Sequence, residues 1–266
     1  MEVAIQRVIS EMWDRYFEPI NLGELASSVF VSPFHFLRVF TRTTGVTPGK
    51  YLSAIRMYEA KRLLLTTSLR VSDIVNEVGY RSPGTFTTRF TQAVGMTPSQ
   101  YREPSVGELF IAVGPKFSRM PLLRALRETN SDTRQGNASI AGTIELPWGA
   151  APANVLICVF REQVPQCAPV AHELLPGSGS GRFTIRGLPP GRCKVIAVAE
   201  SQSETSDPIL FAASPVRVIP DGVTFVRLRL RKPWPTDPPL AVSLASRVTA
   251  TAATMDRTAA RDRRAA

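Results

Sequence analysis

The first hundred residues of the chain repeat themselves with a spacing of fifty. The matching pairs, in chain order, are Ser32-Pro33 with Ser82-Pro83, Phe36 with Phe86, Phe40-Thr41 with Phe90-Thr91, Gly45 with Gly95, Thr47-Pro48 with Thr97-Pro98, and Tyr51 with Tyr101. Upstream of these pairs the best spacing is forty-nine, which places Leu25 on Ile74 and Val29 on Val78. The second copy therefore has one extra residue in a turn, where insertions are tolerated. Such a repeat predicts two copies of one supersecondary unit.

Each copy has the pattern of two short helices. Apolar residues three and four positions apart give each first helix one apolar face. Each second helix opens with Ser-Pro, in which the serine is the predicted N-cap, and ends at a glycine. Asn21 and Ser72 are the predicted N-caps of the first helices, and Gly79 is expected to take a positive φ in the second turn. The four helices are expected at 22–28, 33–44, 71–78 and 83–94. Two helices joined by a tight turn, twice over, predict an all-α double helix-turn-helix domain at 1–103.

A continuous helix is predicted between the two copies, at 48–65. Its apolar side contains Tyr51, Leu52, Ile55, Tyr58, Leu63 and Leu64, which we expect to face inward. Eighteen residues at about 1.5 Å each make this helix about 27 Å long. That length can hold two recognition helices near one turn of B-DNA apart, about 34 Å, so that both enter successive major grooves.

An ordered series of residues extends through this repeat. It consists of Leu25-Ala26, Ser32, Phe36-Leu37-Arg38-Val39-Phe40, Gly45-Val46-Thr47-Pro48, Arg56, Ala60, Leu63-Leu64, Ile74, Gly79-Tyr80, Phe86, Phe90, Gly95-Met96-Thr97-Pro98 and Tyr101-Arg102. In this order and spacing the series resembles the DNA-binding domain of the AraC/XylS family of transcriptional regulators. The resemblance implies sequence-specific recognition of double-stranded promoter DNA by the helices at 33–44 and 83–94.

The resemblance also assigns DNA-facing positions. These are Phe34, Leu37 and Arg38 in the first recognition helix, and Pro83, Gly84, Thr85, Thr87 and Thr88 in the second. His35, Arg42, Arg81, Ser82 and Arg89 complete the predicted DNA-binding set, and Lys50 is a further candidate for a phosphate contact. Thr88 stands where the first copy has Arg38, and Arg89 follows one position later. One position is about 100° on a helix, so we expect Arg89 at the phosphate flank and most direct base readout from the first helix.

Structural roles compete with DNA contacts at several of these positions. Phe36, Phe40, Phe86 and Phe90 recur at a spacing of four and are expected in the core. Phe34 either stacks on a thymine methyl or a deoxyribose, or covers the edge of the domain. His35 is expected at the surface or on a phosphate and not on a metal, because no second His or Cys lies nearby in the sequence.

The second half of the chain changes to strand periodicity. Pro and Gly interrupt 104–137, which we expect to be a linker with one short helix near 120–128. Candidate strands lie at 139–146, 154–160, 170–175, 182–186, 193–200, 209–218 and 223–230. They predict an all-β antiparallel sandwich domain at 138–232. The tail at 233–266 is rich in Ala, Thr and Arg and is expected to be disordered.

Residues 181–198, which include the turn Leu188-Pro-Pro-Gly, resemble the strand-turn-strand signature of prealbumin-like, carboxypeptidase-regulatory-type domains. Cys193 stands where those domains commonly have a tyrosine. The resemblance implies a binding or scaffolding module without a catalytic set. We therefore expect the sandwich to sense a small-molecule effector or to mediate self-association, and RNA polymerase is a further candidate partner.

The charge of the chain suits a polyanionic partner. The net charge is +10 and the pI about 10.1. Residues 1–103 contribute twelve Lys and Arg against nine Asp and Glu, so the helical domain alone carries little of this excess. Apolar stretches such as 155–160 are too short to span a membrane. The start of the chain lacks the layout of a signal peptide, and we expect a cytoplasmic protein.

Catalysis, metal binding and cofactor binding are not expected. The three cysteines, Cys158, Cys167 and Cys193, form no Cys-x-x-Cys pair, and His172 has no evident nucleophile and acid in a recognisable motif. A rival hypothesis is a DNA-repair methyltransferase fused to a related DNA-binding domain, but no cysteine has the Pro-Cys-His-Arg context that those enzymes need. A second rival is a weakly specific nucleoid-type binder. Its affinities for specific and for random DNA at fixed salt would be similar, which would distinguish it from a regulator.

Overall fold

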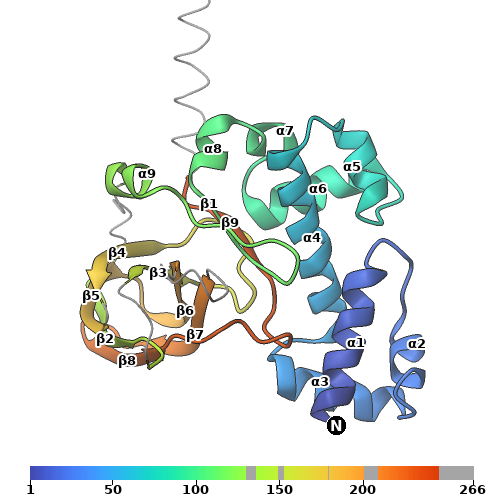
Figure 1. The fold of residues 1–266 in the computed structure, drawn as a ribbon, viewed down its shortest axis with the longest axis horizontal. Coiled ribbons are helices and arrows are strands. Elements are labelled where there is room, and N and C mark those ends of the chain that lie inside the picture. Colours follow the sequence, from blue (N-terminus) through green and yellow to red (C-terminus); the bar gives the residue numbers. More distant parts are fainter. Residues whose placement is uncertain (130–135, 149–152, 179, 201–208, 246–266) are drawn as a thin grey trace, which may run out of the picture.

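The computed structural model describes residues 1–129, 136–148, 153–178, 180–200 and 209–245, which form a helical part and a β-rich part (Figure 1). The helical part contains α1 (Glu2–Asp14), α2 (Leu22–Ser27), α3 (Pro33–Thr44), α4 (Pro48–Thr66), α5 (Val71–Glu77), α6 (Pro83–Val94), α7 (Pro98–Tyr101) and α8 (Pro104–Glu108). Its central axis is α4, which has α1 to α3 at one end and α5 and α6 at the other (Figure 1).

The two copies of the sequence repeat keep the same ring contacts in space. In the first copy, Phe40 packs edge-on against Tyr51 with ring centroids 5.6 Å apart. In the second, Phe90 packs in the same way against Tyr101 at 5.5 Å. The four phenylalanines predicted in the core are all buried: Phe36, Phe40, Phe86 and Phe90. Each helix-turn-helix thus has its own aromatic core attached to the helix that follows it.

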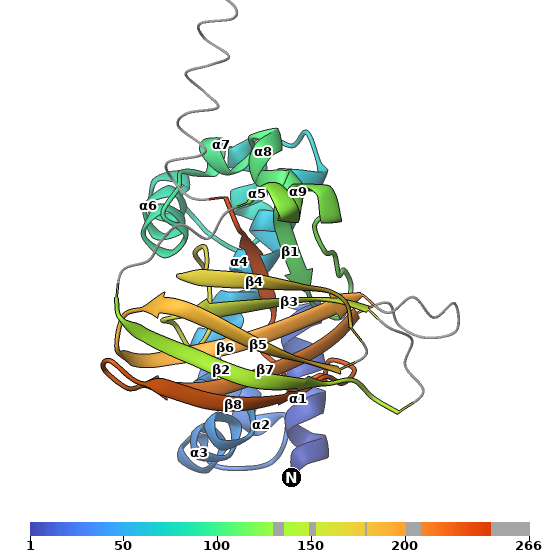
Figure 2. The same ribbon diagram turned by 90° about the vertical axis from the view of Figure 1, so that its left-hand side faces the viewer.

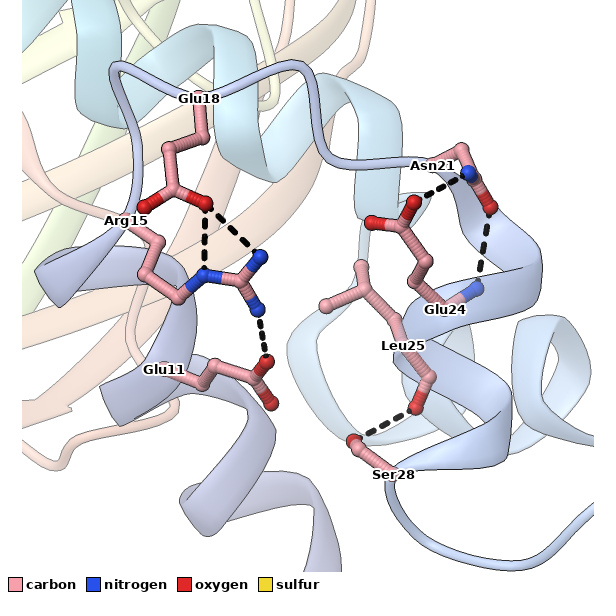
Figure 3. Close-up of polar contacts among 7 residues, drawn as sticks. All are labelled: Glu11, Arg15, Glu18, Asn21, Glu24, Leu25 and Ser28. Atoms are coloured by element: carbon pink, nitrogen blue, oxygen red, sulfur yellow. Dashed lines mark hydrogen bonds and ion pairs between the residues drawn. The ribbon is translucent and has the colours of Figure 1, made fainter.

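Polar contacts fix the segment between α1 and α2 (Figure 3). Arg15 pairs with Glu11 at 2.6 Å and with Glu18 at 2.8 Å. The side-chain oxygen of Asn21 accepts from the backbone N–H of Glu24 at 3.0 Å, and its amide donates to the Glu24 carboxylate at 2.7 Å. Asn21 is therefore the N-cap of α2, as predicted, and it determines where the first helix-turn-helix begins.

Serine caps start both recognition helices but not α5. Ser32 and Ser82 each accept a hydrogen bond from the backbone N–H three residues later, at 3.3 Å and 3.4 Å, which confirms their predicted role. The prediction for Ser72 is wrong. The N-cap of α5 is Arg70, whose side chain makes no capping bond, and Ser72 lies inside the first turn with its hydroxyl directed to Asp73. The apolar pattern begins at Val71, the first helical residue, so the cap lies two positions earlier than predicted.

The turn between α5 and α6 requires a glycine. Gly79 has a φ of 75°, which confirms the prediction, and a Cβ there would lie 2.5 Å from the carbonyl oxygen of Phe17. We expect Gly79→Ala to lower the free energy of unfolding by about 2 kcal/mol or more, because strain adds to a clash with main chain. Gly95→Ala is the control, since its φ is 84° but no atom lies within 4 Å of the added Cβ. It should lose about 1 kcal/mol. Equal losses in urea denaturation would contradict the clash.

Two sheets make up most of the β-rich part (Figure 2). Their strands are β2 (Ala138–Glu145), β3 (Ala153–Phe160), β4 (Ala171–Ser178), β5 (Ser180–Leu188), β6 (Gly191–Glu200), β7 (Ile209–Val218) and β8 (Val223–Arg229). Each of the seven predicted segments is a strand. One sheet has the order β4-β3-β6-β7 and is antiparallel, and the other has the order β5-β2-β8.

The pairing of β2 with β8 is parallel, which differs from the predicted all-antiparallel arrangement. The chain leaves β7 in one sheet and enters β8 in the other through the short segment 219–222. Strand β8 therefore starts at the end of the sheet where β2 also starts. Local alternation of apolar residues cannot reveal this crossing, because it is the same for both strand directions.

The middle of β6, a central strand of the four-stranded sheet, is buried on both faces. Along β6, Cys193 and Val195 join residues of the other sheet, such as Ile140, in one apolar cluster. Ile196 lies on the opposite face, in a second cluster that includes Val242. Both faces of β6 are therefore covered in its central part, one by the second sheet and the other by segments next to the helical part.

The predicted linker and tail both contain regular structure. The range 104–137 contains α8, β1 (Phe110–Val113) and α9 (Leu123–Glu128), and the range 233–266 contains β9 (Leu240–Ser243). Strands β1 and β9 pair antiparallel with each other. The short helix predicted near 120–128 is α9. Strands β1 and β9 were not predicted, and they give regular structure to parts of the expected linker and of the expected disordered tail, because each strand completes its hydrogen bonds with a partner far away in the sequence. Residues 130–135 and 246–266 lie outside the described residues.

A buried lysine of α4 joins the helical part to the β-rich part. Lys61 is fully buried, and its ammonium donates to the backbone and side-chain carbonyls of Gln166 at 2.8 and 2.9 Å and to the carbonyl of Ala241 at 2.7 Å. Of the six apolar residues predicted to face inward from α4, five are buried and Leu63 is half-buried. The lysine between them was not predicted to be buried.

Two tyrosines of α4 add to this interface. The hydroxyl of Tyr51 lies 3.1 Å from the carbonyl of Pro235 and 2.9 Å from that of Asp237. The hydroxyl of Tyr58 donates to the carbonyl of Phe117. The helix that joins the two helix-turn-helix units is thus also the helix that holds the β-rich part.

Candidate DNA-binding surface

The two recognition helices, α3 and α6, lie on the same side of the molecule, at the left of Figure 2. In α3 the buried face consists of Phe36, Val39, Phe40 and Thr44. The opposite face carries Phe34, Arg38 and Arg42, which are spaced by four residues and are all exposed, Phe34 at 78%. Because residues four apart share one face of a helix, these three side chains form one exposed row.

The second recognition helix presents a smaller and less charged row. Phe86, Phe90 and Val94 are buried, and Gly84 and Thr88 are exposed at the positions equivalent to Phe34 and Arg38. The other predicted DNA-binding residues are also accessible. Pro83, Thr85, Arg81 and Arg89 are exposed, whereas His35, Leu37, Ser82 and Thr87 are half-buried. The structure therefore brings the predicted residues onto the two helices, and their contact with DNA stays a prediction.

The arginines of this surface are available for an anion. Arg38, Arg42 and Arg81 form no ion pair with any residue of the described ranges. By contrast, Arg56 in the middle of α4 donates to the carbonyls of Tyr16 and Glu18 at 2.7 Å and has a structural role. A guanidinium group that is exposed and unpaired does not have to break an existing ion pair when it binds a phosphate or the edge of a guanine.

Arg89 lies apart from the exposed row of α6. Its equivalent in α3 is Val39, which is buried at 4% exposure, and α1 packs against α3. Arg89 instead lines a hollow of about 870 Å³ together with Gln92 of α6, Lys50 of α4 and the β3–β4 loop, which contributes Glu162. No pattern in the sequence indicates that this loop lies beside the second recognition helix.

The described residues give little support for metal binding or for a reactive side chain. No three His, Cys, Asp or Glu side chains in the described ranges lie close enough together to hold a metal ion. Cys158 and Cys193 are buried, and burial raises the pKa of both thiols, which keeps them protonated and unreactive. Burial also lowers the pKa of His172. Among the helices described, none has the length and apolar character needed to cross a membrane.

Comparisons with known proteins concern the helical part. Residues 25–104 match a family model described as a helix-turn-helix domain. The chain is 36% identical over 98 residues to the lactose operon transcription activator of Staphylococcus xylosus. This match covers 37% of this chain and 35% of that protein. It is 33% identical over 99 residues to the bifunctional transcriptional activator/DNA repair enzyme AdaA of Bacillus subtilis (strain 168). That match covers 37% of this chain and 47% of AdaA.

Among solved structures, the DNA-binding domain of the global transcriptional factor AdpA, in complex with a target DNA, is 28% identical, with a TM-score of 0.36. That match covers 37% of this chain and 88% of the AdpA chain. The chain spans between a third and a half of the length of the two curated relatives. By its sequence series, its two exposed recognition helices and the family model that it matches, the segment 25–104 is a helix-turn-helix domain of the AraC/XylS type.

Proposed function

We propose that this protein is a sequence-specific DNA-binding transcriptional regulator that places α3 and α6 in successive major grooves of a promoter. The observation that carries the proposal is the pair of exposed recognition helices on one side of a single rigid axis. Helix α4 has 19 residues, which corresponds to about 28 Å. Two helices held at this spacing match one turn of B-DNA, about 34 Å, closely enough for one chain to contact both grooves.

The two helices would divide the recognition unequally. Helix α3 offers a guanidinium at Arg38, the ring of Phe34 and the half-buried Leu37. Helix α6 offers hydroxyls, methyl groups and backbone N–H groups at Gly84, Thr85, Thr87 and Thr88. Arginine reads guanine by two hydrogen bonds in the major groove, so α3 would supply most of the base discrimination. Arg42, Arg81, His35, Ser82 and Arg89 would bind phosphates and fix the register.

The test of this proposal is Arg38→Ala, measured on a duplex that the full chain selects from a random pool. We expect a loss of about 1 to 3 kcal/mol and a relaxed preference at one base pair. Arg42→Ala is the matched control, because Arg42 lies one turn further on the same exposed row. It should weaken all sequences equally and reduce the salt slope by about 1. Equal weakening of all sequences by Arg38→Ala would contradict base readout.

The same experiment distinguishes a sequence-specific regulator from the main alternative, a weakly specific nucleoid-type binder. A weakly specific nucleoid-type binder would bind the selected duplex and a random duplex with similar affinity at fixed salt. A sequence-specific regulator should prefer the selected duplex by a factor of about 10³ or more. We therefore expect no strongly preferred sequence to emerge from the pool if the nucleoid-type alternative is correct.

We infer that the two facing sheets form a β-sandwich of the prealbumin-like type, and that it modulates DNA binding. Apolar residues of both sheets, such as Ile140 and Val195, share one core, which supports the sandwich. The β-rich part contacts α4 through Tyr51, Tyr58 and Lys61, and α4 sets the spacing of the recognition helices. An effector or a second subunit that shifted the sandwich would thus change how α3 and α6 fit the DNA.

A further inference from the structure

One end of the β-rich part points to the same side of the molecule as the recognition helices (Figure 2). At this end β3 finishes, β6 begins and β7 finishes, since the register pairs Phe160 with Lys194 and Gly191 with Val218. The loop that follows β3 lines the hollow beside Arg89 and Gln92 of α6. This end of the sheet therefore lies next to the second recognition helix.

Three exposed arginines occupy this end of the four-stranded sheet: Arg161, Arg192 and Arg217. The register places Arg192 directly opposite Arg217 on the neighbouring strands β6 and β7. Cys193 and Val195 point into the core between the sheets, so Arg192 projects from the other face, together with its partner Arg217. That face of the sheet is the one that packs against β1 and β9. We call these three residues the arginine end.

The arginines of this end are not neutralised by ion pairs within the part of the chain that the structure describes. None of its three guanidinium groups forms an ion pair within the described residues. Glu162, the acid next to Arg161, instead accepts from the backbone N–H of Gln166 at 3.1 Å and from the Cys167 thiol. Like charges directly opposite each other on neighbouring strands destabilise a sheet. A binding partner with closely spaced negative charges would relieve this repulsion.

The loop beside the arginine end is held in place. Lys194 donates to the carbonyl of Gln163 at 2.7 Å, and Lys61 of α4 donates to Gln166. These two bonds tie the loop to β6 on one side and to the axis of the helical part on the other. The arginine end is thus positioned relative to α6 by hydrogen bonds and does not depend on a flexible linker.

We propose that Arg161, Arg192 and Arg217 bind phosphates of the DNA backbone beside the site read by α3 and α6. Guanidinium groups bind phosphate oxygens in pairs of charge-assisted hydrogen bonds, and closely spaced arginines match the regular charges along a strand. This inference rests on the proposed function, because it places DNA along the recognition helices. It also gives a role to basic residues outside 1–103, where most of the net charge of the chain resides.

The test compares two double variants of the full chain. R192A/R217A removes the opposed pair of the arginine end. R182A/R186A is the matched control, since both residues are exposed on β5 and project from the outer face of the other sheet, opposite Phe183 and Ile185. The probes are the selected duplex, with ten base pairs of flanking DNA on each side, and a random duplex of equal length. Salt titrations give the affinity and the salt slope for each.

We expect R192A/R217A to reduce the salt slope by about 2 on both duplexes, because each lost phosphate contact contributes about 0.9. Affinity at low salt should fall roughly tenfold, whereas the preference for the selected duplex should not change. The control should leave the slope unchanged. Stability in urea should be unchanged or higher for R192A/R217A, since a repulsion is removed, so misfolding cannot imitate the result.

Unchanged slopes would overturn the inference and would point to an acidic protein as the partner of this surface. Equal reductions in both double variants would also overturn it, because the slope would then follow the net charge of the chain and not the position of the arginines. The proposed function can fail separately. If the chain selects no preferred sequence, sequence-specific regulation is wrong, but the salt slopes on the random duplex still decide whether the arginine end contacts DNA. If Arg38→Ala loses base preference while R192A/R217A changes nothing, only the present inference fails.

Discussion

Ending the chain after Lys232 is expected to remove most of the free energy of unfolding. The deletion removes β9, whose register partner is β1, and it exposes all four buried residues of β1. Leu240, Val242 and Leu244 are themselves buried at 2%, 0% and 6% exposure. Burying such a side chain contributes about 1.5 to 3 kcal/mol, and the three together amount to a large share of the 5 to 15 kcal/mol that stabilises a typical protein.

The deletion also leaves Tyr51 of α4 without the two carbonyl acceptors that it has on Pro235 and Asp237. Lys61 loses one of its three acceptors, the carbonyl of Ala241, and keeps the two on Gln166. A buried donor without a partner costs about 1 to 3 kcal/mol, and more when it is charged. The damage should therefore spread from the β-rich part into the axis of the helix-turn-helix domain, and promoter binding should be lost together with stability.

A chain that ends after Ala245 is the matched control, because it keeps β9 and every one of these contacts. Urea denaturation followed by circular dichroism would give both stabilities, and amide hydrogen exchange would report on Phe110 to Val113 directly. We expect the control to unfold near the midpoint of the full chain and the shorter chain to be largely unfolded or to lose protection throughout β1. Equal midpoints would show that the segment 233–245 is dispensable.

The helical part could be predicted from the sequence because its signals are local. A serine before a proline starts each recognition helix, and Gly45 and Gly95 end them in the left-handed conformation. The fifty-residue spacing then duplicates each observation, so that an error in one copy is visible in the other. The exposed row of Phe34, Arg38 and Arg42 follows from the same helical period.

The pairing of β1 with β9 could not be predicted, because the partners Phe110 and Ser243 are far apart in the chain. Each strand is only four residues long, and apart from Ser243 all of these residues are apolar, a pattern without alternation. For the same reason the opposition of Arg192 and Arg217 became visible only with the strand register. Period-two patterns gave the position of every strand in the two sheets but not its neighbours.

For Lys61 the position on the helix could be predicted from the sequence, but its burial could not. It lies three residues after Tyr58 and three before Leu64, on the inward face of α4, so its position was visible in the sequence. A lysine at such a position normally extends to solvent. Here it stays inside because carbonyl groups of Gln166 and Ala241, from two distant segments, surround the ammonium group. The acceptors, and not the helix pattern, decide the burial.

Replacing Lys61 with alanine is expected to lower the free energy of unfolding by about 3 to 5 kcal/mol, because three acceptors lose their donor and a cavity replaces the side chain. Lys50→Ala is the control. Lys50 lies on the first turn of the same helix and is exposed. Its substitution should change stability by less than about 0.5 kcal/mol. Similar losses for both variants would contradict the role of the buried ammonium in joining the two parts.

The effect of Lys61 should also depend on pH, with a definite sign. Burial lowers the pKa of Lys61 in the folded protein to about 7, although the nearby Cys167 and Glu162 oppose this, whereas its ordinary value is 10.5. Between these two values the unfolded chain binds a proton at this position that the folded protein has released, so the contribution of Lys61 to stability rises with pH. The slope can reach about 1.4 kcal/mol per pH unit.

The loss caused by Lys61→Ala should therefore grow from pH 7 to pH 9, whereas the small effect of Lys50→Ala should stay constant. Urea denaturation of the wild type and both variants at pH 7, 8 and 9 measures this difference. The other titrating groups are common to all three chains, so their contributions cancel in the comparison, except that of Cys167, whose pKa is raised by burial and lowered by the charge of Lys61. A loss that stays constant over this range would mean that Lys61 keeps its proton in the folded protein and that the three carbonyl acceptors outweigh the cost of burying its charge.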